Sequence, residues 1–443
     1  MGKLTFKGGV HPFDGKEFSK DKPIKELLPE GDMVFPLSQH IGAPAVPVVA
    51  KGDHVLAGQL IAEAGGFISA NIHSSVSGTV KAIEPRTLAT GGKCNSIIIE
   101  NDGKYEEVEY VKTKFEDLTN DMIREKVKAA GVVGMGGAGF PANVKITPKD
   151  PEAIDYVIVN GAECEPYLTS DYRRLLEEPE KVVMGLKIVL KLFDKAQGVI
   201  AIEDNKPEAI AVMEKACAGE DRISVKVMKT KYPQGGERFL ISAVTGREIN
   251  SSMLPADAGC IVHNVDTVTS IYFACIEGFP LTKRIVTVTG DGVKEPQNFY
   301  VYLGMNFRQL LDAAGGPVGE PEKYISGGPM MGFAMYSLDV PVVKGSSSLL
   351  VLQKDPVKDL KASACIRCGK CVSACPSHIV PVMMMKAALK GDCDTFEKLN
   401  GMECMECGSC TFVCPAKRPL TQAFKEMRKT VAANRRKKAQ GGK

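Results

Sequence analysis

The sequence has no hydrophobic run long enough to cross a membrane. Its strongest apolar stretch, residues 182–193 of 443, is interrupted by Lys187 and Lys191, whereas a transmembrane helix needs about 20 predominantly apolar residues in a row. The segment from Met1 to Thr5 also lacks the apolar core of a secretory signal peptide. We therefore expect a protein that stays inside the cell and does not itself span a membrane.

A strong excess of one charge is missing too. The chain carries 56 Lys and Arg against 53 Asp and Glu, a net charge of +3. Residues 425–443 hold eight basic residues and one acidic residue, so the rest of the chain is mildly acidic. Without an overall basic field, we do not expect nucleic acid as a partner. The 44% hydrophobic and 25% charged residues are ordinary for a globular protein, and this length allows about three domains.

Cysteine, by contrast, is abundant, with 14 residues of which eight lie between Cys365 and Cys414. Disulfides are rare in the reducing interior of a cell, so metal binding is the better explanation. The eight cysteines form two copies of one pattern, at 365–376 and 404–415, with three cysteines at intervals of three, a fourth after four residues and then a proline. Zinc ribbons also use Cys-x-x-Cys pairs, but they do not repeat this longer run.

This run is that of the bacterial two-cluster ferredoxins, in which the fourth cysteine ligates the other cluster. Three closely spaced thiolates wrap a loop around one cubane, and the fourth lies on the helix that follows. We therefore predict two 4Fe–4S clusters. The first is assigned to Cys365, Cys368, Cys371 and Cys414, and the second to Cys404, Cys407, Cys410 and Cys375.

A glycine-rich loop follows a helix that we predict over 120–130, for which Asn120 can provide the N-cap and Gly131 the C′ residue. The loop has four glycines within residues 134–139, and Lys145 comes shortly after it. Glycines let backbone amides approach an anion closely, and the lysine can add a positive charge. A dinucleotide fingerprint would lie between a strand and a helix, and a Walker loop would end in Gly-Lys-Ser/Thr, so the loop fits neither.

The segment after this loop predicts a largely parallel sheet. Strands over 156–159, 199–202 and 223–227 alternate with a helix over 207–218. Polar loops follow at 160–166, 232–237 and 264–267, the last opening a helix that runs through Cys275. Because ligands of such sheets bind at the carboxyl ends of the strands, these loops are candidates for a binding site.

The loops together resemble the flavin- and NADH-binding subunit of respiratory complex I, in which a glycine loop, an Asn-x-x-Glu-x-Glu-Pro loop and an Asn-Val-x-Thr helix start clasp FMN. A closer resemblance, over all but the tail, is to the RnfC family, which belongs to the Rnf complexes, the membrane-bound, ion-translocating ferredoxin:NAD oxidoreductases. It rests on the cluster pair and on the segments Gly8-Gly9-Val10-His11-Pro12, Gln39-His40-Ile41-Gly42-Ala43-Pro44 and Tyr232-Pro233-Gln234-Gly235-Gly236-Glu237.

The resemblance implies noncovalent FMN as a cofactor and NAD(H) as a substrate. It places Glu163 and Glu165 beside the flavin and the nicotinamide, as the catalytic residues. The cofactor-binding residues that it implies are Gly134, Gly136, Gly137, Ala138, Gly139, Phe140, Lys145, Asn160, Glu163, Glu165, Tyr232, Gly235, Glu237, Asn264 and Thr267. The complex I pattern is not kept at Met135, Pro148, Ala162 and Gly236.

The fold class that we expect is a multidomain α/β protein. We predict a barrel-sandwich domain over 1–112, a Rossmann-like FMN- and NADH-binding domain over 113–282, a soluble-ligand-binding β-grasp (SLBB) domain over 283–350, a ferredoxin-like domain over 355–424 and a basic tail over 425–443. Barrel-sandwich domains of the lipoyl type carry a modified lysine at a hairpin tip, but here Ala70-Asn71-Ile72 occupies the turn. A docking or structural role is therefore expected for that domain.

The resemblance implies a peripheral redox subunit at the cytoplasmic face of the cell membrane, with integral membrane and ferredoxin-like subunits as partners. It would exchange electrons between NAD(H), through FMN, and the two clusters, and so couple ferredoxin:NAD+ oxidoreduction to the transport of Na+ or H+. Two alternatives stay open, namely a soluble NADH dehydrogenase or diaphorase subunit and a flavin-free, ferredoxin-like adaptor. The sequence does not decide the ion, the direction of electron flow or the role of the basic tail.

Overall fold

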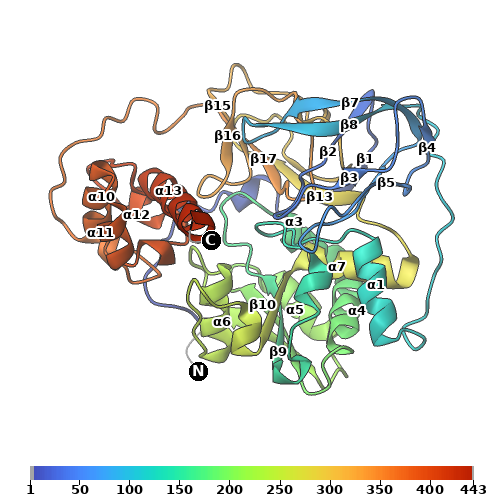
Figure 1. The fold of residues 1–443 in the computed structure, drawn as a ribbon, viewed down its shortest axis with the longest axis horizontal. Coiled ribbons are helices and arrows are strands. Elements are labelled where there is room, and N and C mark those ends of the chain that lie inside the picture. Colours follow the sequence, from blue (N-terminus) through green and yellow to red (C-terminus); the bar gives the residue numbers. More distant parts are fainter. Residues whose placement is uncertain (1–3, 442–443) are drawn as a thin grey trace.

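The computed structural model describes residues 4–441, and their side chains as far as residue 438. Figure 1 shows a helical C-terminal domain on one side, an α/β domain at the bottom and two β-rich domains above it. These are the ferredoxin-like, flavin-type, barrel-sandwich and β-grasp domains of the expected fold class. Within the described residues, no helix is long and apolar enough to cross a membrane.

The flavin-type domain is built on a parallel sheet, as predicted. Its four strands lie in the order β11-β10-β9-β12, and every pair is parallel. Their bounds are β9 Tyr156–Gly161, β10 Gln197–Glu203, β11 Ile223–Met228 and β12 Cys260–Asn264. Buried β-branched residues alternate between the faces, so that Val157 and Val159 pack with one set of helices and Ile158 with another. The strands therefore end at one edge of the sheet, where the polar loops begin.

Helices cover both faces of this sheet. Those on the Val157 face include α1 Asn120–Ala129, α4 Pro179–Leu190, α5 Pro207–Ala216 and α7 Val265–Tyr272, α3 Ser170–Glu177 lies beside β9, and α6 Glu237–Thr245 covers the Ile158 face. The cap that we predicted for α1 is wrong by one residue, because the side chain of Thr119, not Asn120, accepts the amide of Met122. Gly131 follows with φ +64°, as a C′ glycine should.

The barrel-sandwich domain consists of two small antiparallel sheets. They are β2-β8-β7-β4 and β3-β5-β6, with bounds β2 Asp32–Pro36, β3 Val46–Pro47, β4 His54–Val55, β5 Leu60–Glu63, β6 Ile72–His73, β7 Gly78–Thr87 and β8 Lys93–Asn101. The hairpin tip is held by its neighbours: Asn71 donates to the carbonyl of Ala129, and Lys344 donates to the carbonyls of both Asn71 and Gly131. A tip fixed between two other domains does not swing, which agrees with a docking role.

The β-grasp domain contains a six-stranded sheet that also takes in the N-terminal segment. The order is β1-β14-β13-β17-β15-β16, and β1 (Ile24–Leu27) pairs in parallel with β14. The other bounds are β13 Lys283–Thr289, β14 Gln297–Tyr302, α8 Phe307–Ala313, β15 Lys323–Ser326, β16 Phe333–Met335 and β17 Ser348–Leu352. The first 30 residues thus contact other domains instead of the barrel sandwich, a pairing that the predicted boundary 1–112 does not anticipate.

The ferredoxin-like domain is small and helical. Its elements are α9 Lys370–Ser373, α10 Pro381–Lys390, α11 Cys393–Lys398, α12 Ser409–Phe412 and α13 Leu420–Gly441. Helix α13 crosses residue 425, where we predicted a separate tail, because Met427 and Val431 are buried beside Phe424 in the core of this domain. Only the part of the helix beyond Val431 is a charged, exposed extension.

Candidate cofactor site

The glycine-rich loop lies between α1 and the short helix α2 (Ala142–Lys145), next to the ends of the parallel strands. Gly136, Gly137 and Ala138 are exposed. A side chain at Gly137 would meet no atom within 4 Å, whereas a Cβ on Gly136 would lie 2.9 Å from the Cβ of Asn264. The loop therefore presents its backbone to open space on one side and rests on the start of α7 on the other, as a phosphate cradle must.

Thr267 and Asn264 support this loop from below. Thr267 is completely buried and accepts a hydrogen bond from the amide of Met135 at 3.0 Å. The Asn264 side chain caps α7 through the amide of Asp266 and donates to the carboxylate of Asp171 at 2.7 Å. Both residues were predicted to hold the flavin directly. Their contacts here are with the protein, and these contacts position the loop.

A second loop forms the other wall. Asn160, at the end of β9, donates to the carbonyl of Gly235 at 2.8 Å, and the amide of Gly235 donates to the thiol of Cys164 at 3.2 Å. The turn between them is strained, because Glu163 has φ +44°. Two of the predicted cofactor loops, 160–166 and 232–237, are thereby joined into one wall.

The two predicted catalytic acids are in different situations. Glu163 Oε1 accepts the amide of Asp171 at 2.7 Å, whereas its buried Oε2 has no hydrogen-bond partner and lies 3.9 Å from Lys16 Nζ. Burial raises the pKa of Glu163, against the opposing effect of Lys16 and Lys206. Glu165 Oε1 instead accepts the amide of Met330, in the β-grasp domain, at 2.7 Å. Glu163 therefore has a free acceptor, and Glu165 joins two domains.

Lys145 and Glu237, both predicted to bind the cofactor, lie together. The ammonium group of Lys145 is 3.0 Å from Glu237 Oε1 and donates to the carbonyl of Val262 at 2.7 Å. Phe140, also predicted, is only partly buried and closes the glycine loop through its carbonyl, which accepts the amide of Gly134. These residues surround the same end of the sheet as the glycine loop.

The cysteines of the two motifs intermix. Cys375, from the first motif, lines one cavity together with Cys404, Cys407 and Cys410 of the second. At the other site, the pKa of Cys371 is raised by burial and by the neighbouring thiolates of Cys414 and Cys368. Among the described residues, no three His, Cys, Asp or Glu side chains converge closely enough to hold a single ion. Thiols spread around the wall of a cavity fit a polynuclear cluster, although the ligand sets themselves stay a prediction.

Sequence reasoning assigned no role to several residues that the structure brings to the site. Lys16 is buried and donates to the carbonyl of Leu168. His40 lies against the glycine loop, since a Cβ on Gly139 (φ +69°) would be 3.1 Å from its Cα. The motif that contains His40 marked the family resemblance, so the signal was present in the sequence, but its location could not be read there.

The protein's own groups are compatible with FMN. Gly136, Gly137 and Ala138 are exposed beside Lys145, which provides amides and a positive charge for a phosphate. Buried polar atoms without a partner lie in the adjoining loops, namely Glu163 Oε2 and Gln234 Nε2. Buried polar groups are normally paired, so these atoms are suited to a ligand that brings its own donors and acceptors.

Four family models match successive parts of the chain. They are the RnfC barrel sandwich hybrid domain over residues 4–104, the Nuo51 FMN-binding domain over 127–273, the SLBB domain over 285–334 and a 4Fe-4S dicluster domain over 357–415. Each match falls within the corresponding domain that we predicted from the sequence.

Curated relatives, all of them RnfC proteins, match the chain over most of its length. The chain is 48% identical to the one in the proton-translocating ferredoxin:NAD(+) oxidoreductase complex of Clostridium ljungdahlii, over 89% of this chain and 86% of the relative. It is 45% identical to the one in the Na(+)-translocating ferredoxin:NAD(+) oxidoreductase complex of Acetobacterium woodii, over 98% of each. The corresponding protein in an ion-translocating oxidoreductase complex of Rhodobacter capsulatus is 39% identical, over 95% of this chain and 82% of the relative.

Proposed function

The chain belongs to the RnfC family of the ion-translocating ferredoxin:NAD oxidoreductase (Rnf) complexes, and from this we propose that it exchanges electrons between NAD(H), through FMN, and two 4Fe–4S clusters. In that role it couples ferredoxin:NAD+ oxidoreduction to ion transport by the complex. The relatives differ in their ion, one translocating protons and another Na+. The ion therefore stays open between H+ and Na+.

Each group of residues has a defined task in this proposal. Bound FMN supplies the conversion between a two-electron hydride and single electrons. The exposed amides of residues 136–138 and Lys145 bind its phosphate and ribityl chain. Thr267 and Asn264 hold the loop in place, and the free oxygen of Glu163 is available to accept a hydrogen bond from flavin or nicotinamide. Glu165 fixes the β-grasp domain against the same loop.

The observation that carries this proposal is that the glycine loop, the 160–166 loop and the 232–237 loop meet at one edge of the sheet, beside the second cysteine motif. A visible spectrum of the purified protein, with flavin extraction and iron analysis, tests it. We expect one FMN and about eight irons per chain, as two 4Fe–4S clusters require. Full iron without any flavin, after reconstitution with FMN, would instead favour the adaptor.

The two other functions that the sequence left open are less well supported. A flavin-free adaptor leaves the joined loops and the match to an FMN-binding domain unexplained. A soluble diaphorase subunit leaves the barrel-sandwich match and the relatives that align over 98% of the chain unexplained.

We also propose a peripheral position at the cytoplasmic face of the cell membrane, with integral membrane and ferredoxin-like subunits as partners. The support is the family, whose members are subunits of ion-translocating complexes, and the lack of a membrane-spanning helix among residues 4–441. The exposed basic part of α13, with Arg435, Arg436, Lys437 and Lys438, is suited to an anionic surface of a partner or of the membrane.

Replacing Lys145 with alanine should weaken FMN binding and leave the iron content unchanged. A hydrogen bond from a charged group contributes about 1.5–3 kcal/mol, so the Kd for FMN should rise about tenfold to a hundredfold. Fluorescence titration of the flavin-stripped protein measures this Kd, and iron analysis of the same sample checks the clusters.

Lys149→Ala is the matched control, because this exposed lysine has the same charge and lies four residues further along the chain. Its Kd for FMN should equal that of the wild type. An unchanged Kd in Lys145→Ala, or an equal rise in both variants, would remove Lys145 from the phosphate site.

A further inference from the structure

The second cysteine motif, not the first, faces the flavin-type domain. The hydroxyl of Tyr232, a residue that is 2% exposed, donates to the carbonyl of Cys407 at 2.7 Å. One residue further on, a Cβ on Gly408 would lie 3.1 Å from the carbonyl oxygen of Met330. The amide of Met330 is the one that Glu165 holds. Both loops of the proposed flavin site thus end on residues 407 and 408.

A second set of contacts strengthens the same seam. Arg238, in the first turn of α6, forms an ion pair with Glu403 at 2.9 Å, and the amide of Ser251 donates to the same carboxylate at 2.8 Å. Glu403 directly precedes Cys404 in the chain. The whole edge of the second motif, from 403 to 408, is therefore tied to the flavin-type domain.

A strap from the N-terminus fills the remaining space. Val10 and Tyr232 exchange backbone hydrogen bonds of 2.8 and 2.9 Å, and the amide of Gly9 donates to the carbonyl of Ala374 at 2.9 Å. Both glycines of the strap have positive φ, and a Cβ on Gly8 would lie 2.8 Å from the carbonyl oxygen of Cys375. Only glycines allow the strap to lie this close to Cys375.

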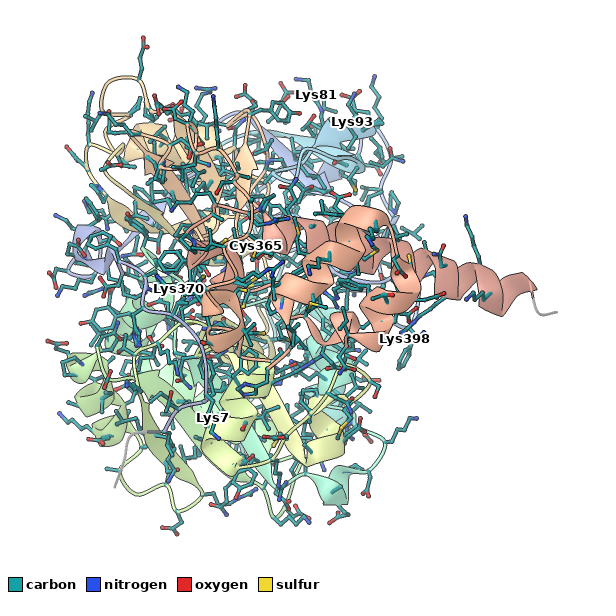
Figure 2. The ribbon with its side chains drawn as sticks, turned by 90° about the vertical axis from the view of Figure 1, so that its left-hand side faces the viewer. Lys7, Lys81, Lys93, Cys365, Lys370 and Lys398 are labelled. Atoms are coloured by element: carbon teal, nitrogen blue, oxygen red, sulfur yellow. The ribbon has the colours of Figure 1, made fainter. Side chains whose placement is uncertain are left out.

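The first motif is on the opposite, outer side. Cys365 and Cys368 are exposed, as is every residue from 356 to 370. Figure 2 looks onto the ferredoxin-like domain and shows Cys365 and Lys370 on the side that faces the viewer. Of the first motif, Ala374 and Cys375 make the contacts with the strap, and Cys375 lines the cavity of the second motif.

From these contacts we infer that the cluster held by Cys375, Cys404, Cys407 and Cys410 is the flavin-side cluster, and that Tyr232 and the strap of residues 8–10 are positioning residues that hold it against the flavin loops. This inference rests on the proposed function. NADH gives up a hydride to become NAD+, the proton of that hydride is released to solvent, and its two electrons pass singly, one to each cluster. The cluster at Cys365, Cys368, Cys371 and Cys414 then lies further along the path and is reduced through the first.

A pair of variants in the full chain, reconstituted with FMN and iron, tests the order. Cys414→Ala removes a ligand of the outer cluster, and Cys375→Ala removes a ligand of the flavin-side cluster. After rapid mixing with NADH and freezing, electron paramagnetic resonance should show the remaining cluster of Cys414→Ala reduced as fast as in the wild type. In Cys375→Ala the fast phase should be lost, although dithionite still reduces the remaining cluster. The opposite pattern, or equal fast phases in both variants, would overturn the order.

Tyr232→Phe keeps every cysteine and does not depend on the stability of a damaged cluster domain. It removes a hydroxyl dipole whose positive end points at the peptide of a cluster ligand, so the reduction potential of one cluster should fall. The potential of the other cluster should not change. Tyr105→Phe is the matched control, because its hydroxyl also donates to a backbone carbonyl, that of Pro29 at 2.9 Å, in another domain. Two unchanged potentials in Tyr232→Phe would overturn the role of Tyr232.

The wild-type sample separates this inference from the proposed function. If NADH reduces neither flavin nor clusters in the wild type, the proposed function fails. If the wild type is reduced normally and the two cysteine variants do not differ as stated, the order of the clusters fails while the function stands.

Discussion

Replacing Gly136 with valine should abolish FMN retention and also destabilise the flavin-free protein. A Cβ at this position would lie 2.9 Å from the Cβ of Asn264, whose side chain caps α7 and bonds to Asp171. Forcing extra carbons into such a packed contact costs about 1–3 kcal/mol, and the displaced loop no longer presents its amides. Flavin content after gel filtration measures the first effect, and the melting temperature of the stripped protein measures the second.

Gly137→Ala is the informative partner of this variant. A Cβ on Gly137 meets no protein atom within 4 Å, so the melting temperature of the stripped protein should stay that of the wild type. FMN affinity should nevertheless fall, because the added methyl occupies the space in front of the exposed amides. If Gly137→Ala binds FMN as tightly as the wild type does, the phosphate does not lie on this face of the loop.

Removing the carboxylate of Asp266 should produce the largest loss of stability. Asp266 is 2% exposed and lies between two buried guanidinium groups, with Arg174 Nε at 3.0 Å and Arg284 Nη2 at 3.8 Å. Burial lowers the pKa of Arg284, and Asp266 opposes that shift. Asp266→Ala leaves both cations without this partner, and breaking a buried ion pair in this way costs about 3–5 kcal/mol. Urea unfolding followed by near-ultraviolet circular dichroism measures the change.

The exposed pair of Arg308 and Asp339 provides the control. Their charged groups are 3.1 Å apart, but the side chains are 54% and 64% exposed. Asp339→Ala should therefore change the free energy of unfolding by about 0–1 kcal/mol. If the two variants lose equal stability, the buried network around Asp266 contributes no more than a surface ion pair.

Features that depend on short spacings could be read from the sequence. The two cysteine runs show their chemistry because a loop of 2-2-3 spacing brings its thiols together wherever it lies in the fold. The strands of the parallel sheet were found for a similar reason, since each is a short run of buried, β-branched residues such as Val157 to Val159. The glycine loop was also visible, because Gly136 and Gly137 stand beside each other in the chain.

The roles of individual site residues needed the tertiary structure. Thr267 was assigned to the flavin by resemblance, yet it is buried beneath the glycine loop and holds the amide of Met135. Glu165 was paired with Glu163 as a second acid, yet it binds the backbone of Met330 in another domain. Which partner a side chain meets depends on how the loops pack, and local spacing carries no record of that.

The sequence by itself determined which groups this protein brings to its chemistry, namely eight cluster cysteines, a glycine loop and the loops at the ends of a parallel sheet. Only the tertiary structure decided how they face one another. The hydroxyl of Tyr232 meets Cys407 across 175 residues of chain, and Gly8 approaches Cys375 from the other end of the sequence. Such contacts depend on the mutual packing of domains that are each stabilised by their own core, so no local pattern predicts them.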